Sequence, residues 1–445
     1  MESKIRDLIV PLSQRLIKQL TASLEAAKAD HLTLMAIEVL VAKLIANFAL
    51  ELLSGLLAIL FQNTKPTIVS CQNCHKKMPL QGYLSRTVIS LFGRFSYKRA
   101  FYYCRACKQS RTPFDEQLAL GERTCSPRLQ RIVAFLSAHL SFSTVSATVS
   151  ECFDVEVSAE AVRQISEEVG RQCQDWEQQQ RQSYEQQEVD KRPDSRMPKT
   201  WVIEADGKLV GFQEGGFQEV KVGVIYDVAQ RVEPNTGRKE LLKREVVARR
   251  CGWQEFSKDF WAAMKRAGVK DGDRLVAVAD GAHSMEQIFA FVAPEATRIR
   301  DFYHVAERIQ AIAEVRFGEG VDEGKAWAKA KLEKLKESEV EKVIRSIAHL
   351  KIETKTGEET RRQVLGYLRN HSEAMDYRSY REEGLPIGSG AVEGGCRLIG
   401  ARTNGCGRRW GESGCDAVVA LRVTVLNDRL DKIRPMPQLA LNLAA

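Results

Sequence analysis

The stretch RLVAVADGAHSMEQIFAFVAPEATRIRDFYHV, residues 274–305, decides the fold class. Two runs within it, RLVAVA and TRIR, are short and rich in apolar residues and predict strands. Between them, the segment from Ser284 to Val292 predicts a helix. Strands that alternate with helices are typical of an α/β sheet, so we expect this part of the chain to form one.

Three more strands are predicted upstream: WVIEAD, which ends at Asp206, then VKVGVIYDV and KREVVARRC, followed by a helix from Trp253 to Ala267. Asp206 and Asp280 each end a strand and each precede a glycine. Either Asp-Gly pair alone favours a simple turn. Acids at the ends of two strands can also converge on one metal site. Glu204 shares a strand face with Asp206 and is easily mistaken for a ligand.

A third acid stands in IGSGAVEGGCRLIGARTNGCGRRW, residues 387–410, which holds seven glycines, four arginines and the single carboxylate of Glu393. Taken alone, Glu393 is as well explained as a solvated loop residue. Together with Asp206 and Asp280, on a helix that begins near Ser389, it predicts a triad that binds two Mg²⁺ or Mn²⁺ ions through oxygen ligands. The four arginines of this stretch are then predicted to hold DNA phosphates: Arg397, Arg402, Arg408 and Arg409. Trp410 is predicted either to stack on a base or to pack the helix.

Glu393 lies 113 positions after Asp280, which is too far for a simple connection. From Val305 to Arg381 the sequence is charged and favours helices, which predicts an all-helical insertion in the α/β core. The expected organisation has six parts: a helical region 1–65, a zinc ribbon 66–125, a helix-turn-helix with linker helix 126–190, a catalytic core 200–304, a helical insertion 305–384, and the end of the core 385–433.

Two CxxC pairs predict a structural zinc site. Its four thiolates are Cys71, Cys74, Cys104 and Cys107. The intervening TVISLFGRFSYKRAFYY has β-branched and aromatic residues around a central glycine, which favours a strand pair that connects the two knuckles. Four unrelated thiols are the alternative interpretation.

The net charge of +8 is unevenly distributed. Residues 65–130 contain twelve Lys or Arg and three Asp or Glu. Residues 151–190 contain three Lys or Arg and eleven Asp or Glu. Basic residues alternate with aromatic ones around the second knuckle, a pattern suited to phosphate contact and base stacking. The predicted DNA-binding residues there are Arg94, Lys98, Arg99 and Arg105.

A helix-turn-helix is predicted between these two regions of opposite charge. Its first helix is capped by Ser143 or Thr144, and its second begins at Ser158 and ends near Gly170. The second helix exposes many acids, which opposes contact with DNA, so a purely structural helix pair is an equal alternative. The prolines of KRPDSRMPK, residues 191–199, predict a linker after it.

The segment from Leu32 to Phe61 is apolar but interrupted by Glu38, Lys43 and Glu51. Each charge would cost about 2.5–3.5 kcal/mol at a bilayer centre. We therefore expect a buried helical hairpin or an oligomer interface rather than a membrane span. The first residues, MESKIRDLIV, lack the layout of a signal peptide, and a cytoplasmic location is expected.

These motifs resemble those of a known family. The segments CQNC, FGRFSYKRAFYYCRAC, IEADGKLV, VAVADGAH, DFYHV and LPIGSGAVEGGCRLIGARTNGCGRRW are similar to bacterial insertion-sequence transposases of the DDE, RNase H-like class, ISKra-type group. The resemblance covers most of the chain after residue 65. It implies an RNase H-like core in which Asp206, Asp280 and Glu393 are the catalytic acids, with Asp301 and His304 in support.

The resemblance also implies a function: binding of double-stranded transposon ends and target DNA by a nucleoid-associated homo-oligomer, followed by hydrolysis and strand transfer. Two alternatives remain open. One is an RNase H-like nuclease that cuts without joining. The other is a zinc-ribbon DNA-binding regulator that lacks chemistry, which the presence of all three acids disfavours.

Overall fold

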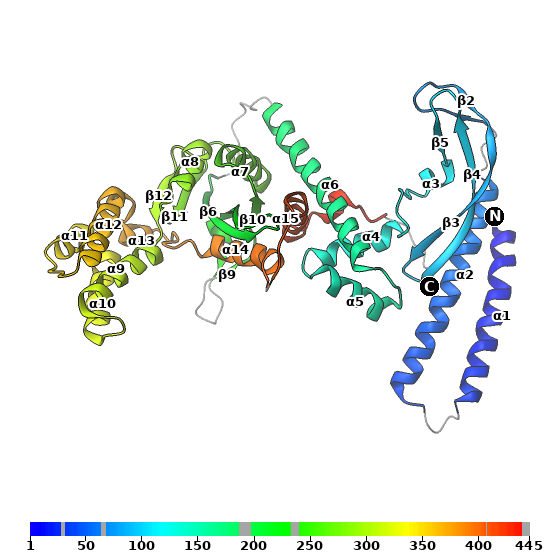
Figure 1. Cartoon of the computed structure of the whole chain (residues 1–445), viewed down its shortest axis with the longest axis horizontal. Helices are drawn as coiled ribbons and strands as arrows, with labels where there is room; N and C mark the ends of the chain where they lie inside the picture. The colour runs from blue at the N-terminus through cyan, green and yellow to red at the C-terminus, as the bar shows by residue number, and fades with distance from the viewer. Residues whose placement is uncertain (28–31, 64–67, 187–196, 233–239, 406, 438–445) are drawn as a thin grey trace. The chain divides into compact units, whose positions relative to one another are not determined.

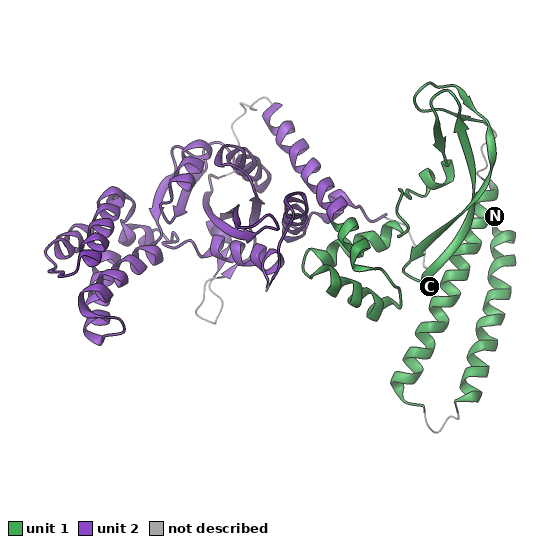
Figure 2. Cartoon of the chain, in the orientation of Figure 1, with its two compact units in different colours: residues 1–166 green, residues 167–445 purple. Residues whose placement is uncertain are grey.

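The computed structural model describes residues 1–27, 32–63, 68–186, 197–232, 240–405 and 407–437. Most of the predicted linker, residues 191–196, lies outside these ranges. The chain divides into two compact units, Met1–Ser166 and Glu167–Ala445 (Figure 2). The fold is mixed α/β, and each unit is considered by itself.

Unit 1 begins with two long helices, α1 (Glu2–Ala26) and α2 (Leu34–Asn63), which pack along each other (Figure 1). Arg15 on α1 forms an ion pair with Glu51 on α2 at 2.6 Å. A helical hairpin is therefore present, but it is not buried as predicted, because most residues of both helices are exposed or only partly buried. By length and composition, Leu34–Gln62 is the one helix among the described residues that can cross a membrane, and 17% of its most apolar window is buried.

Five strands follow the helical hairpin. The short β1 (Val69–Ser70) pairs with β2 (Lys77–Met78), and the longer β3 (Leu80–Ser90) and β4 (Gly93–Cys104) form an antiparallel sheet with β5 (Gln109–Arg111). The predicted strand pair around the central glycine is the β3–β4 hairpin. Leu57 of α2 packs with Val88, Tyr97 and Phe114, the last of these on α3 (Pro113–Gln117), so the helical hairpin contributes to the small core of this sheet.

Unit 1 also contains α4 (Pro127–Ser137), α5 (Phe142–Phe153) and the start of α6 (Ala159–Gln186), whose remainder belongs to unit 2. The cap of α5 is Ser141, rather than Ser143 or Thr144, because Ser141 is the residue with extended backbone whose side chain accepts the Thr144 amide. Ser158 accepts the Ala161 amide at 3.2 Å.

The second helix does not end near Gly170; α6 continues to Gln186. A Cβ at Gly170 would collide with the backbone oxygen of Ala417 on α15 (Glu412–Leu426). The glycine therefore permits a close approach of two helices within unit 2, and it is no stop signal.

Unit 2 contains a five-stranded mixed sheet in the order β10-β7-β6-β11-β12. Its strands are β6 (Thr200–Gly211), β7 (Phe217–Asp227), β10 (Glu245–Arg249), β11 (Arg274–Ala279) and β12 (Thr297–Arg300). β6, β7 and β10 are antiparallel neighbours, and β11 and β12 run parallel to β6. After β7, a short turn of helix, η2 (Val228–Gln230), leads into the small pair β8 (Arg231–Val232) and β9 (Glu240–Leu241).

The strand that carries Asp206 does not end there. β6 continues to Gly211 because it stays paired with β7, from Asp206↔Val222 to Gly211↔Phe217. Its pairing with β11 ends earlier, at Glu204↔Val278. Asp206 therefore lies where β6 separates from its parallel neighbour.

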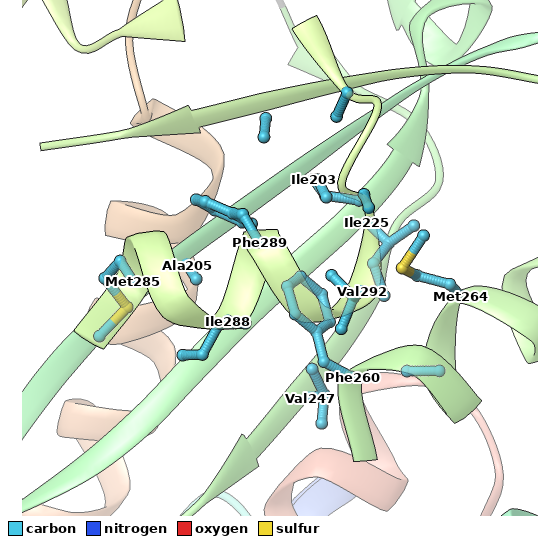
Figure 3. Close-up of a cluster of buried hydrophobic side chains, with 14 of the residues drawn as sticks. Ile203, Ala205, Ile225, Val247, Phe260, Met264, Met285, Ile288, Phe289 and Val292 are labelled. Carbon is cyan, nitrogen blue, oxygen red and sulfur yellow. The ribbon is translucent and has the colours of Figure 1, made fainter. Parts of the chain in front are cut away.

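Helices cover both faces of the sheet. On one face, α7 (Trp253–Ala267) and α8 (His283–Val292) form an apolar cluster with the sheet, in which Phe289 of α8 is buried together with alternate strand residues such as Ile203 and Ala205 (Figure 3). The other alternate residues of β6 face α14 (Gly390–Thr403), beside which α15 packs, and the short α16 (Leu430–Ile433) follows. The core thus fixes which strand residues point toward the helix that carries Glu393.

Between β12 and α14 the described residues form helices and turns only. The helices are α9 (Phe302–Phe317), α10 (Asp322–Lys336), α11 (Val340–Ala348), α12 (Lys355–His371), η3 (Ser372–Ala374) and α13 (Tyr377–Glu382). This helical part enters and leaves the sheet at the same edge, because Phe302 donates its backbone N–H to Ile387 at 2.8 Å.

Candidate functional site

Three acids follow the register of the parallel strands to one edge of the sheet. The last β6–β11 pair is Glu204↔Val278, so two residues further along each strand stand Asp206 and Asp280. The last β11–β12 pair is Ala279↔Arg300, and the next residue after Arg300 is Asp301. Paired residues of parallel strands share a face of the sheet, so this register gathers the three acids on the side of α14.

Two buried carboxylates hold the first turn of α14. Glu204 is fully buried; its Oε2 accepts the Val392 N–H at 2.8 Å and its Oε1 accepts the Tyr226 hydroxyl at 2.9 Å. Burial raises the pKa of Glu204 to about 7. Asp301, also fully buried, accepts both the backbone N–H and the hydroxyl of Ser389 through Oδ2. The helix that carries Glu393 is therefore fastened to the middle of β6 and to the residue that follows β12.

Asp301 fastens a second helix at the same time. Its Oδ1 caps α9 by accepting the N–H groups of Tyr303 at 2.6 Å and His304 at 3.3 Å. A Cβ at Gly388 would lie 2.6 Å from the ring of Tyr303, so the glycine allows the chain before α14 to approach α9 closely. As a result, the starts of α9 and α14 lie side by side.

This arrangement brings together three side chains that can hold a metal ion: Asp301, His304 and Glu393. One ligand atom from each lies within 4.8 Å of the others. His304 and Glu393 are partly exposed, with 37% and 39% of their side chains accessible. Each also contacts an ionisable side chain outside the group: His304 lies 3.2 Å from Glu307, and Glu393 lies 3.2 Å from Arg397.

Asp206 and Asp280 fall outside this group of ligand atoms. Asp206 Oδ1 accepts the backbone N–H of the next residue, Gly207, at 2.7 Å. Asp280 Oδ1 accepts the Ala282 N–H at 2.8 Å. The thiol of Cys396, one turn after Glu393, lies 3.6 Å from Asp206 Oδ2. Burial, followed by the nearby Asp206 carboxylate, raises the pKa of Cys396 to about 12, so the thiol stays neutral beside the acids.

The helical insertion also contacts this edge, at residues that the sequence analysis did not identify. The Tyr367 hydroxyl on α12 donates to the backbone oxygen of Asp280 at 2.6 Å. Buried Arg300 bonds Glu286 at 2.9 Å and His371 Nδ1 at 2.9 Å. These contacts join residues that are 71 positions apart, in Arg300–His371, and 87 positions apart, in Asp280–Tyr367. No local sequence pattern predicts them; the sequence indicated only that a helical insertion is present.

The four arginines predicted to hold phosphates divide into two kinds. Arg397 and Arg409 are exposed. Arg402 is buried, its guanidinium lies 5.1 Å from the Trp410 ring, and its backbone oxygen accepts from Arg408 at 2.6 Å. Trp410 is buried too and donates its indole N–H to Thr403 at 2.7 Å. In this structure Arg402 and Trp410 stabilise the end of α14 and neither faces solvent.

In unit 1 the two knuckles bring their thiols together. Cys71 lies after β1 and Cys104 ends β4, and with Cys74 and Cys107 their four sulfur atoms lie within 4.8 Å of one another. The Sγ atoms of Cys74 and Cys104 are 3.6 Å apart. Backbone N–H groups of Cys74 and Asn73 lower the pKa of Cys71 to about 6, whereas hydrogen bonding to Cys74 raises the pKa of Cys107 to about 12.

The basic residues on β4 and its knuckle also divide by environment. Arg94, Lys98 and Arg105 are exposed. Arg99 is mostly buried and forms an ion pair with buried Asp115, which also binds Arg86 at 2.7 Å and accepts the Tyr97 hydroxyl. Burial lowers the pKa of Arg99. Its contacts are those of a core ion pair, whereas the other three face solvent.

A family model described as Uncharacterised protein family (UPF0236) matches residues 31–433. This match covers most of the chain, including both groups of candidate ligands, and the chain belongs to that family. A comparison with curated proteins gives no significant match.

Proposed function

We propose that this member of the UPF0236 family is a DNA transposase that uses Asp206, Asp280 and Glu393 for phosphodiester hydrolysis and strand transfer. One observation carries the proposal. Asp206 and Asp280 stand at equivalent positions beyond the last pair of two adjacent parallel strands, and the helix that covers that face presents Glu393. The proposal is that these three carboxylates, which come from separate segments, act together on a DNA phosphodiester.

An RNase H-like core is part of this proposal. It is supported by a five-stranded mixed sheet with helices on both faces and by the acids at the edge where β6 and β11 separate. A helical insertion between β12 and α14 also agrees with it. The inserted helices do not disturb the core, because the chain leaves and re-enters at the same edge.

The residues at this edge fit a hard divalent cation such as Mg²⁺ or Mn²⁺, since carboxylate oxygens are the ligands that these ions prefer. Two such ions at the site would activate a water or a 3′-hydroxyl and stabilise the leaving oxygen. The chain's own contribution is placement. Glu204 and Asp301 fix α14, Tyr367 holds the backbone at Asp280, and exposed Arg397 and Arg409 attract DNA phosphates.

The four-cysteine group is proposed to bind one structural Zn²⁺. A tetrahedral site with Zn–S bonds of about 2.3 Å has sulfur–sulfur edges of about 3.8 Å. The observed 3.6 Å between Cys74 and Cys104 is close to that value. The ion would lock the knuckles at the ends of the β1–β2 and β4–β5 pairs, and Arg94, Lys98 and Arg105 on this platform are proposed to contact DNA phosphates.

A cytoplasmic homo-oligomer also belongs to the proposal. Several apolar residues of the helical hairpin are more than half exposed, among them Ile17 at 64%, Leu34 at 72% and Met35 at 74%. A two-helix hairpin has no layer to cover both of its faces, so a second copy of the chain is the proposed cover. The ion pair of Arg15 with Glu51 adds charge that disfavours a membrane-embedded hairpin.

The test is cleavage of a supercoiled plasmid that carries the inverted repeats expected beside the gene, with Mg²⁺ or Mn²⁺ present. Asp206→Asn, Asp280→Asn and Glu393→Gln each keep the side-chain size but remove a charge that holds a cation. We expect cleavage to fall to background in all three while DNA binding is retained. Glu382→Gln, at an exposed acid on α13, is the matched control and should cleave normally.

A wild-type cleavage rate in Glu393→Gln would show that Glu393 is only a solvated helix residue and would overturn the proposed triad. Cleavage without end joining would identify a nuclease. DNA binding without any cleavage by the wild-type protein would instead identify a DNA-binding regulator.

A further inference from the structure

The Asp301, His304 and Glu393 group contains a nitrogen ligand, which a triad of acids does not. An imidazole beside carboxylates changes the class of ion that a site accepts. Magnesium is held through oxygen in proteins, whereas imidazole suits transition metals. The ring of His304 lies within 4.8 Å of a Glu393 carboxylate oxygen, so one ion can contact both side chains.

The orientation of His304 points to ligation. Its Nδ1 lies 3.2 Å from Glu307 Oε2, one turn further along α9. In the tautomer whose Nδ1–H faces Glu307, Nε2 is the ring nitrogen that can bind a cation. Metal-binding histidines almost always have such a partner on the other ring nitrogen. Glu307 lies outside the ligand group, so this contact is an observation separate from the clustering.

Asp301 has a different part in the group. Its two oxygens accept from four donors: the backbone N–H groups of Tyr303 and His304 on one oxygen, and the N–H and hydroxyl of Ser389 on the other. A carboxylate has about four acceptor positions, so Asp301 has little capacity left for a metal. It acts as the anchor that places His304 and Glu393 opposite each other.

The local charge favours a cation. Asp301, Glu393 and Glu307 are three acids around one imidazole, and Arg397, which pairs with Glu393, is 82% exposed and free to turn toward DNA. Water or a DNA phosphate can complete the coordination, because both protein ligands are partly open to solvent.

We propose that His304 and Glu393 bind one divalent transition-metal ion, with Mn²⁺ as its chemical representative, and that Asp301 positions both ligands. The inference rests on the proposed function only in sharing Glu393 with the triad. It adds a nitrogen ligand and a preference: this site binds Mn²⁺ more tightly than Mg²⁺.

The experiment uses the metal-free full-length chain and Mn²⁺ alone, without DNA. Pulsed electron paramagnetic resonance detects ¹⁴N coupling when imidazole nitrogen is bound directly to Mn²⁺. We expect this coupling in the wild-type protein and in His349→Ala, whose histidine is exposed on the insertion, and its loss in His304→Ala. Glu307→Gln should keep the coupling but weaken Mn²⁺ binding about 10–100-fold, the usual effect of removing the carboxylate partner of a ligating histidine.

Mn²⁺ bound to the wild-type protein without ¹⁴N coupling, or coupling that survives His304→Ala, would overturn the inference. The wild-type spectrum alone can contradict the inference, so the test remains decisive even if a variant fails to fold. The outcome is separable from the proposed function. Absence of coupling in the wild-type protein together with Mg²⁺-dependent cleavage contradicts the nitrogen site and leaves the acid triad in place, whereas coupling without cleavage supports the site and contradicts the transposase.

Discussion

The four-cysteine group in unit 1 and the acid–histidine group in unit 2 are both candidate metal centres, and they are built in opposite ways. The cysteines come as two local pairs in tight turns, and Cys71 and Cys104 are buried. The acids and the histidine come from strand ends and two helices, and His304 and Glu393 remain partly exposed. Closed sulfur sites are structural, whereas sites with open positions support chemistry.

The difference also explains how each group is held. In the cysteine group, local turns place the two thiols of each pair, and a small shared core brings the pairs together. The acid–histidine group depends on long-range anchors, because Glu204 and Asp301 reach α14 from residues 188 and 88 positions away. Removing a ligand should therefore unfold the first region, whereas removing an anchor in the second should misplace a ligand.

The largest expected effect is at the cysteine group. Cys104→Ser should reduce bound zinc from one ion per chain to nearly none and unfold the β1–β5 region, since structural zinc contributes roughly 10–16 kcal/mol in small zinc domains. Elemental analysis and amide hydrogen exchange measure the two consequences. Cys152→Ser, at an exposed cysteine of α5, is the control. Unchanged zinc in Cys104→Ser would show that the four thiols are unrelated.

A middle-sized effect is expected at the anchor Glu204. Glu204→Leu leaves the Val392 N–H and the Tyr226 hydroxyl without their buried acceptor, at a cost of roughly 1–3 kcal/mol. Cleavage should fall with it. Burial raises the pKa of Glu204 to about 7, so its neutral form is populated at neutral pH and Gln is a close substitute.

Glu204→Gln should therefore keep most of the stability and the cleavage rate. Chemical denaturation and plasmid cleavage, measured on both variants, test this. If Glu204→Gln lost cleavage as completely as Asp206→Asn, then Glu204 would be a metal ligand and the distinction between anchors and ligands in unit 2 would fail.

The smallest effect concerns the exposed bases of β4. Replacing Arg94 and Lys98 with Ala should weaken DNA binding at low salt and reduce the slope of log affinity against log salt by about one for each phosphate that is no longer neutralised. Lys329→Ala, an exposed base on the helical insertion, should leave the slope unchanged. Arg99 is unsuitable for this test because its ion pair with Asp115 stabilises the core. An unchanged slope in the double variant would place DNA elsewhere.

The sequence predicts these two regions unequally, for physical reasons. The cysteine spacing, the β3–β4 hairpin and the strands of the sheet follow from local patterns of ligands and apolar residues. The register that aligns Asp206 with Asp280 depends on strand pairing across 74 residues, and no local pattern contains it. The same holds for the Asp301–Ser389 contact and for Tyr367 at Asp280.

Residue type alone gave wrong predictions at two places where tertiary packing determines the local structure. Arg402 and Trp410 are residue types that often contact DNA, yet here they are buried against each other at the end of α14. Glycine often follows the end of a helix, yet α6 continues through Gly170 to Gln186, and the absence of a side chain there leaves room for the backbone of α15. In both cases a distant segment decides, and its contact cannot be inferred from neighbouring residues.

The central proposal is that the β1–β5 region held by the cysteine group binds DNA and that Glu393, with Asp206 and Asp280, cuts it. The most direct test compares Cys104→Ser and Glu393→Gln in plasmid cleavage over a range of DNA concentrations. The account predicts that Cys104→Ser needs more DNA but approaches the wild-type rate at saturation, whereas Glu393→Gln binds at wild-type concentrations and does not cleave at any. The same defect in both variants, whether lost binding or lost cleavage, would contradict the division of labour between the two sites.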